Sequence, residues 1–354
     1  MTCKRRCCDT VPCRLPSEVV RRGDLSNGGP GEVITKPLPR YHDLPKVGTA
    51  RQCSAWGVFG ETDRVGRLGL VGPAAVRDAA SLVRTGEVVS LNWPIDLPGP
   101  AILGRESLVH KVRRVEDGLD DSFDSFYPQG SSQWDSLCHM EHPELGAYNG
   151  LGYMGDAASV DRIRSELGIH VWATRGIAGR FVLADLAGYE AFKGQPIDCS
   201  TSDAVSVERI NAVLSASGAS LQEGDVLLVR FGWTAWYEKL SAKERRDLSA
   251  LSMFPAPGLQ RSKEMLQWLW DSGVAAVACD TPALEVMPFE TADVDGFLHY
   301  QLIPLLGFAV GELFSLDALA EVCARTGRYE GFFVAAPLNM PGGIGSPANA
   351  LAIL

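Results

Sequence analysis

The sequence lacks a long apolar run and has no dense cluster of basic residues. None of its 354 residues falls in a stretch of about 18 apolar residues, and even 302–310 contains a proline and a glycine, so no membrane partner is expected. Lysine and arginine number 33 against 43 acidic residues, which gives a net charge of −10. This balance argues against nucleic acid as a partner, because a phosphate backbone attracts basic surfaces.

Two common catalytic motifs are also missing. No Gly-x-Ser-x-Gly occurs, which argues against a serine nucleophile on a strained turn. The run Gly342-Gly343-Ile344-Gly345 follows a predicted strand, but it has no Gly-Lys-Ser/Thr ending and little chain remains for the required helix. Nucleotide binding is therefore not expected, and the chemistry should come from a metal ion or from acid and base groups.

The nine cysteines do not form a zinc pattern. Four of them crowd the start of the chain without a paired Cys-x-x-Cys repeat or a nearby histidine: Cys3, Cys7, Cys8 and Cys13. We expect residues 1–45 to be a disordered or poorly ordered leader, which lacks the apolar core of a secretory signal. The other five cysteines are isolated, as is typical of reduced thiols in a cytoplasmic protein.

Segments of helical and strand character alternate from about residue 70 onward. Predicted helices cover 72–86, 207–214, 257–271 and 316–326, and predicted strands cover 87–91, 225–231, 274–279 and 331–336. Ser206 is the expected N-cap of the second helix. This alternation predicts an α/β fold with a central mixed or partly parallel sheet, in a single catalytic domain over residues 46–354.

A polar segment stands out between Gln129 and His139. In extended backbone Gln133, Asp135 and Leu137 point to the same side, so an amide oxygen and a carboxylate could converge on one atom. His139, four residues after Asp135, could then reach a bound substrate. The alternative is a polar loop whose side chains only satisfy the local backbone.

This segment resembles a motif of the cyclase or kynurenine-formamidase-like family of metal-dependent amide and lactone hydrolases, His-x-Gly-Thr-His-x-Asp-x-Pro-x-His. Asp135 and His139 match its Asp and its last His, while Gln129 and Gln133 stand in place of its first two His. The run Ser-Ser-Gln-Trp-Asp at 131–135 is similar to one branch of that family.

Other parts of the chain carry the same resemblance. His299 and Glu312 are similar to the late His and Glu ligands of the family. Further similar runs are 56–57, 90–94, 104–105, 175–180 and 337–343. The resemblance covers roughly residues 50–354, and it implies a swivelling β/β/α fold.

The resemblance implies a site for one divalent ion. Asp135, His299 and Glu312 are the candidate ligands, and Gln133 and Gln129 could add neutral amide oxygens. This donor set favours manganese, magnesium or a single zinc over a two-zinc centre, with manganese or zinc as the main candidates. Such an ion lowers the pKa of water and polarises a carbonyl group.

Further roles follow for nearby side chains. His139 is the expected general base and later acid, because its usual pKa lies near working pH. Trp134 could form a flat wall of the substrate pocket, with core packing as the alternative. Arg175 and Arg180 could meet a substrate carboxylate, although an internal ion pair is equally compatible with the sequence.

The functional hypothesis is therefore a cytoplasmic, arylformamidase-like hydrolase. It would cleave a formamide-type C–N bond or a lactone in a small cyclic or aromatic metabolite, and a homodimer or homotetramer is expected. One alternative is a metal-free cyclase or dehydratase that uses Asp135, His139 and Glu312 as acid and base groups. Another is a catalytically silent binding protein, against which the costly burial of these polar groups argues.

Overall fold

The structure is a computed structural model that describes residues 37–49, 51–290, 292–294 and 296–354. Most of the expected leader, with its four cysteines, lies outside the described residues. The described residues all belong to the same structural unit, 31–354. Their five cysteines are free thiols. In this part of the chain no helix has the length and apolar character needed to cross a membrane.

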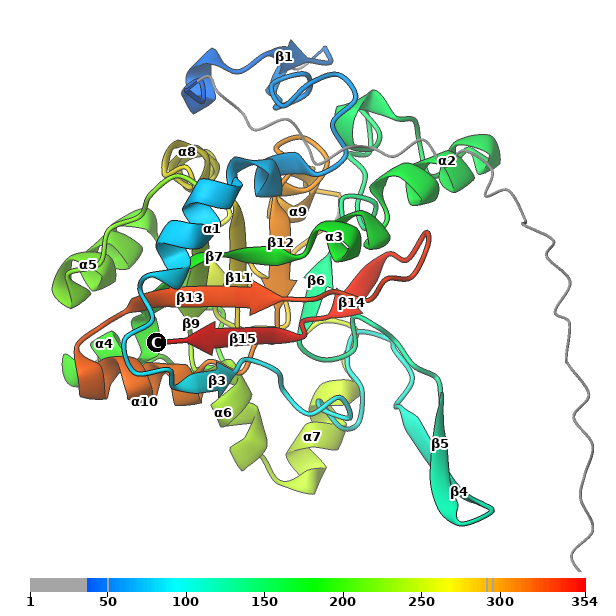
Figure 1. Cartoon of the computed structure of the whole chain (residues 1–354), viewed down its shortest axis with the longest axis vertical. Coiled ribbons are helices and arrows are strands. Elements are labelled where there is room, and N and C mark those ends of the chain that lie inside the picture. Colours follow the sequence, from blue (N-terminus) through cyan, green and yellow to red (C-terminus); the bar gives the residue numbers. More distant parts are fainter. Residues whose placement is uncertain (1–36, 50, 291, 295) are drawn as a thin grey trace, which may run out of the picture. The chain divides into compact units, whose positions relative to one another are not determined.

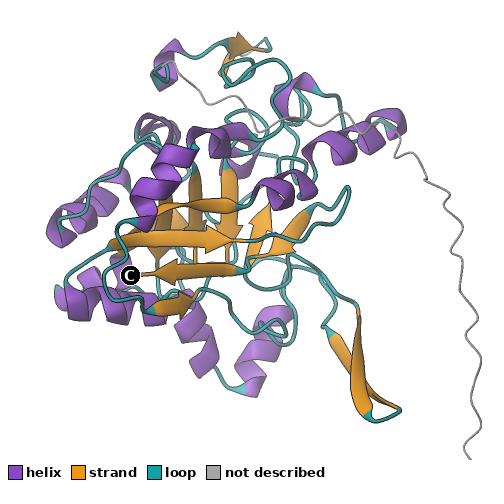
Figure 2. Cartoon of the chain, in the orientation of Figure 1, coloured by secondary structure: helices purple, strands orange, loops and turns teal. Residues whose placement is uncertain are grey.

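A nine-stranded mixed sheet forms the centre (Figures 1 and 2). Its strands in spatial order are β14 (Gly345–Pro347), β6 (Gln133–Asp135), β12 (Ala309–Glu312), β11 (Ala276–Cys279), β9 (Val226–Arg230), β7 (Ile177–Asp185), β13 (Glu330–Ala335), β15 (Ala350–Ile353) and β3 (Val88–Ser90). Strands β12, β11, β9 and β7 run parallel, and the other neighbours pair antiparallel. The predicted α/β fold with a mixed sheet is confirmed.

Helices surround this sheet (Figure 2). They are α1 (Pro73–Ala80), α2 (Ala157–Leu167), α3 (His170–Arg175), α4 (Leu186–Phe192), α5 (Val207–Ser217), α6 (Trp233–Lys239), α7 (Ala242–Ser249), α8 (Lys263–Asp271), α9 (Leu298–Leu302) and α10 (Asp317–Thr326). Short 3₁₀ turns occur at Tyr41–Asp43, Gly66–Leu70 and Tyr148–Gly150. Helix α5 begins where the sequence predicted, because the Ser206 side chain accepts a hydrogen bond from the backbone N–H of Arg209.

Two predicted helices differ from the structure. Helix α1 ends at Ala80 rather than near residue 86, and the Ser81 hydroxyl donates to the Asp78 carbonyl at its end. Residues 257–261 are not helical, since β10 (Gly258–Leu259) pairs with β8 (Ala204–Val205). Helix α8 begins only after Ser262, which caps it.

The parallel strands are buried on both faces, which explains their apolar sequences. All residues of β11, and those of β9 up to Val229, are buried. Aliphatic side chains suit this position, because both faces of a parallel sheet are covered. Helices α1 and α5 pack against β7.

The carboxyl ends of the parallel strands meet at one edge of the sheet. There β12 ends at Glu312 and β9 ends at Arg230, while Asp280 directly follows β11. In sheets of this kind ligands bind outside the carboxyl ends of the strands. Strand β6 pairs antiparallel with β12 and places Gln133 opposite Glu312 at this edge.

Two hairpins lie outside the central sheet. Strands β4 (Val109–Val115) and β5 (Gly118–Asp124) form a ribbon that extends away from it, and every residue of both strands is exposed (Figure 1). Strands β1 (Lys46–Val47) and β2 (Gln52–Cys53) form a smaller pair. The chain re-enters the central sheet through residues 125–132, directly before the site described next.

Candidate metal centre

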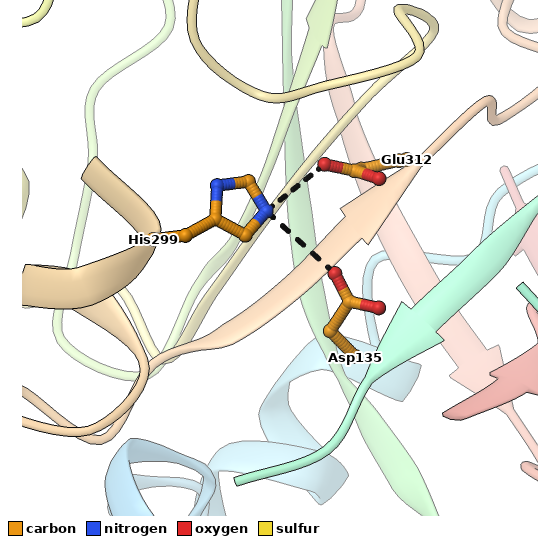
Figure 3. Close-up of side chains that lie close together, drawn as sticks. All are labelled: Asp135, His299 and Glu312. Atoms are coloured by element: carbon orange, nitrogen blue, oxygen red, sulfur yellow. Dashed lines mark ion pairs between the residues drawn. The ribbon is translucent and has the colours of Figure 1, made fainter. Parts of the chain in front are cut away.

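Three buried side chains from distant parts of the sequence converge at the edge of the sheet (Figure 3). Nε2 of His299 lies 3.1 Å from Oε1 of Glu312 and 3.8 Å from Oδ2 of Asp135. One potential ligand atom from each residue lies within 4.8 Å of the other two. Two carboxylates and one imidazole therefore point at a common position.

The strand register explains how these groups meet. Val310 pairs with Asp135 and Glu312 pairs with Gln133, so the two carboxylates lie on adjacent strands. Side chains alternate along a strand, and Gln133 and Asp135 therefore share one face, as the sequence predicted. Nε2 of Gln133 lies 3.4 Å from Oδ1 of Asp135, in agreement with that prediction. His299 is added from the first turn of α9.

The cluster carries more negative charge than its imidazole can offset. Burial raises the pKa of Glu312 to about 7, with Asp135 and Glu285 acting in the same direction against His299. Burial alone would raise the pKa of Asp135, but His139 and His299 lower it below its usual value. Burial opposes the charge on His299, yet the attraction of Glu285 and the nearby carboxylates of Asp135 and Glu312 raise its pKa well above the usual value. A bound cation would relieve the repulsion between these carboxylates.

Unpaired buried oxygens test whether a metal ion fits this cluster. Oδ2 of Asp135 and Oε1 of Gln133 have no hydrogen-bond partner within the described residues. Buried polar atoms without a partner are costly and rare in folded proteins. The free Asp135 oxygen, which lies 3.8 Å from Nε2 of His299, forms with this nitrogen and the Glu312 carboxylate a donor set that suits a divalent cation. The residues present therefore fit the ion.

The two glutamines act as hydrogen-bond donors to the carboxylates. Nε2 of Gln133 donates to Oε2 of Glu312 at 2.7 Å. Nε2 of Gln129 donates to Oδ1 of Asp135 and lies 3.0 Å from Nδ1 of His139. Gln129 thus links the candidate ligand Asp135 to the candidate acid-base residue His139.

His139 lies at the rim of the cluster. Its side chain is 21% exposed, and its Nε2 is 4.0 Å from Oδ1 of Asp135. Burial lowers its pKa, and His299 and Arg105 act in the same direction against the attraction of Asp135. The imidazole is therefore neutral near pH 7 and available for proton transfer.

Arg105 is a charged neighbour of the site that was not predicted from the sequence. Its charge interacts with His139. The loop that carries it is tied to the segment before β6, because the Ser131 hydroxyl donates to the Pro94 carbonyl at 2.9 Å and the backbone N–H of Trp93 donates to the Ser132 hydroxyl at 2.7 Å. The positive charge of Arg105 thus acts on the rim of the cluster.

The structure does not bring the two predicted substrate arginines to this site. Arg180 binds both oxygens of Asp225, at 2.8 and 2.6 Å, and also pairs with Glu330. Asp225 directly precedes β9, so this ion pair lies at the opposite edge of the sheet. Arg175 donates to the backbone carbonyl of Val71. The internal ion pair, left open by the sequence, is the correct interpretation for Arg180.

The Trp134 side chain also lies outside the site. It lies between Gln133 and Asp135 on β6, so its side chain projects from the other face of the strand. Its ring is fully buried against Phe314 and Phe333, and its indole nitrogen donates to a backbone carbonyl. The expected pocket wall is therefore a core residue.

A model of the family Cyclase, described as "Putative cyclase", matches residues 70–286. No match was found among curated proteins. A crystal structure of "a novel cyclase" is 27% identical to this chain, covers 85% of it and 99% of its own length, and superposes with a TM-score of 0.69.

Two isatin hydrolases share the fold at lower identity. Isatin hydrolase A from Labrenzia aggregata, bound to benzyl benzoate, is 18% identical, covers 77% of this chain and 94% of its own, and has a TM-score of 0.50. An isatin hydrolase bound to the product analogue thioisatinate is 14% identical, covers 76% of this chain and 92% of its own, and has a TM-score of 0.52.

Proposed function

Because the chain belongs to the cyclase family, we propose that it is a metal-dependent hydrolase that cleaves an amide or lactone bond in a small cyclic or aromatic molecule. The observation that carries this proposal is the buried cluster of Asp135, His299 and Glu312, in which Oδ2 of Asp135 has no hydrogen-bond partner. The isatin hydrolases, which have the same fold, support hydrolysis as the reaction type.

Asp135, His299 and Glu312 would hold one divalent ion, and Oε1 of Gln133 offers a further oxygen. When bound, such an ion polarises a carbonyl group and lowers the pKa of water. One nitrogen among oxygen donors suits manganese or zinc. In this arrangement the protein supplies the ligands from rigid strands and one helix, which fixes their positions.

His139 would move protons at its Nε2 atom. Since Nδ1 accepts a hydrogen bond from Gln129, the neutral imidazole carries its proton on Nε2 and can donate it to a leaving group. Acting as a base requires an unprotonated Nε2, for which the amide of Gln129 must reverse and accept from Nδ1. The orientation of the Gln129 amide therefore determines whether His139 is ready to donate a proton or to accept one.

The charge near His139 supports a substrate that carries an anionic group. Arg105 lies on a loop tied to the segment before β6 and acts on the charge of His139. A guanidinium group binds a carboxylate through two parallel hydrogen bonds. We expect a carboxylate on the substrate, or one formed by lactone or lactam opening, to lie beside Arg105.

Metal analysis tests the proposal. Protein purified without chelator is analysed for bound metals, then titrated with Mn²⁺ and Zn²⁺, and assayed with isatin and N-formylkynurenine as lactam and formamide probes. Asp135→Ala, His299→Ala and Glu312→Ala should each lose metal and remain folded. Glu190→Ala should keep the metal, because this buried carboxylate of α4 pairs with Arg209 of α5.

Two results would contradict the proposal. Wild-type protein that binds neither Mn²⁺ nor Zn²⁺ would favour metal-free acid-base chemistry at the same residues. Metal binding that survives all three alanine substitutions would place the ion elsewhere.

A further inference from the structure

Glu285 is a buried acid beside the cluster, and it contacts only one of the three candidate ligands. It is fully buried, and it lies in the segment of the chain that connects β11 to α9. Its Oε2 lies 2.8 Å from Nδ1 of His299, and its Oε1 accepts from the backbone N–H of His299 at 3.3 Å. Both oxygens of Glu285 are thus used to hold one histidine.

These contacts determine which nitrogen of His299 is available. A carboxylate only accepts hydrogen bonds, so Nδ1 must carry a proton when it faces Glu285. The remaining nitrogen, Nε2, is the one that faces Asp135 and Glu312 (Figure 3). Once Nε2 has lost its proton, its lone pair is directed at the position that a metal ion would occupy.

Packing fixes the plane of the His299 ring. Phe297 stacks on it with ring centroids 5.1 Å apart and an interplanar angle of 14°. Phe289 stacks in turn on Phe297 at 4.4 Å. The imidazole is therefore held on its face by aromatic rings and on its Nδ1 edge by Glu285.

The backbone of Glu285 is fixed as well. The N–H of Leu259 on β10 donates to the carbonyl of Leu284, and the N–H of Val286 donates to the carbonyl of Leu259. A Cβ atom at Gly258 would lie 2.3 Å from the carbonyl carbon of Glu285, so this close approach needs a glycine. Strand β10, which lies where the sequence predicted part of a helix, thus holds the backbone of Glu285 in place.

From this geometry we infer that Glu285 is a positioning residue of the metal centre, which holds His299 in the tautomer and orientation that present Nε2 to a divalent ion. The inference rests on the proposed metal-dependent function. Partners of this kind, placed behind a metal-binding histidine, typically change metal affinity by about 10 to 100-fold when they are mutated.

Glu285→Gln tests the inference, with Glu190→Gln as a matched control. Glutamine replaces one acceptor oxygen of Glu285 with an NH2 group, which would face an N–H donor of His299. We expect the Kd for Mn²⁺ or Zn²⁺, measured by competition with a chromogenic chelator, to rise by about 10 to 100-fold in Glu285→Gln. It should be unchanged in Glu190→Gln, where the altered carboxylate pairs with Arg209 in another part of the protein.

A spectroscopic readout separates positioning from a general effect on folding. Nitrogen-15 spectra of zinc-loaded wild-type protein should show His299 protonated at Nδ1 and bound to zinc through Nε2. Zinc bound through Nδ1, or an unchanged Kd in folded Glu285→Gln, would overturn the inference. If Glu285→Gln does not fold, the wild-type spectrum still decides the tautomer. Wild-type protein that binds neither ion would instead refute the proposed function itself.

Discussion

A single added methyl group at Gly345 should disturb the candidate metal centre through Gln129. Gly345 lies on β14, opposite Asp135. A Cβ atom there would lie 2.5 Å from Cγ and 2.8 Å from Cδ of Gln129, and 2.8 Å from the carbonyl oxygen of Trp134. The strand carbonyl cannot move freely, so the Gln129 side chain must shift and weaken its hydrogen bond to Asp135. Overpacking of this kind costs about 1–3 kcal/mol.

A double-mutant cycle measures this coupling. Gly345→Ala, Gln129→Ala and the double variant are unfolded in urea without metal, and the free energies of unfolding are compared. Shortening Gln129 removes two of the three close contacts, so Gly345→Ala should cost at least about 0.5 kcal/mol less in the Gln129→Ala background.

The control for this cycle is Gly155→Ala. A Cβ atom at Gly155 meets no other atom within 4 Å, so this change should stay within about 0.5 kcal/mol of wild type. Strictly additive costs of Gly345→Ala and Gln129→Ala would refute the steric argument.

Three further predictions concern separate parts of the structure. His139→Ala should keep the bound metal but lower kcat by about 10² to 10⁴, measured on the substrate that wild type hydrolyses; loss of metal would make His139 a ligand. Arg180→Met should lower the free energy of unfolding in urea by about 3 kcal/mol, because it leaves Asp225 buried without its partner, and should not change the Kd for metal. Burial raises the pKa of Asp280 from its usual 3.8 to about 7, so the folded protein holds this proton more tightly than the unfolded chain does. The resulting stabilisation is fully present below pH 3.8 and is lost as pH rises through about 7. The loss is roughly 4 kcal/mol, and Asp280→Asn should show a smaller fall in unfolding free energy from pH 5 to pH 8 than wild type; an equal fall would contradict the assignment.

The alternation of side chains along β6 shows what a local pattern can predict. The period of two placed Gln133 and Asp135 on one face, and the structure agrees. The same period places Trp134 on the opposite face, so its assignment as a pocket wall conflicted with the pattern that located the site. The alternation alone was therefore sufficient to place Trp134 in the core.

Pairing over long distances is what the sequence could not supply. Arg180 is bound by Asp225 and Glu330, which follow it by 45 and 150 residues. Nothing in the run around Arg180 shows that β9 begins beside it, or at which edge of the sheet it lies. Arg105 was overlooked for the same reason, since the residue on which its charge acts, His139, follows it by 34 residues.

Glu285 was overlooked although its sequence carries a signal. It is the one acid within residues 281–289, a segment otherwise made of apolar side chains and a threonine. A carboxylate in such a segment is expensive to bury unless it has a specific partner. The partner, His299, comes from the next helix along the chain, so burial of the acid was predictable and its role was not.

The two glutamines argue for one metal ion per chain. In the motif that this sequence resembles, histidines stand where Gln129 and Gln133 lie, and imidazoles would add neutral nitrogen ligands. Here both amides direct hydrogens at the carboxylates of Asp135 and Glu312. A second ion would have to bind the same two carboxylates as the first. Amide hydrogens repel a cation, so we expect saturation at one Mn²⁺ or Zn²⁺ per chain in equilibrium dialysis. Two ions per chain, both lost in Asp135→Ala, would show that the amides reverse and act as ligands through their oxygens.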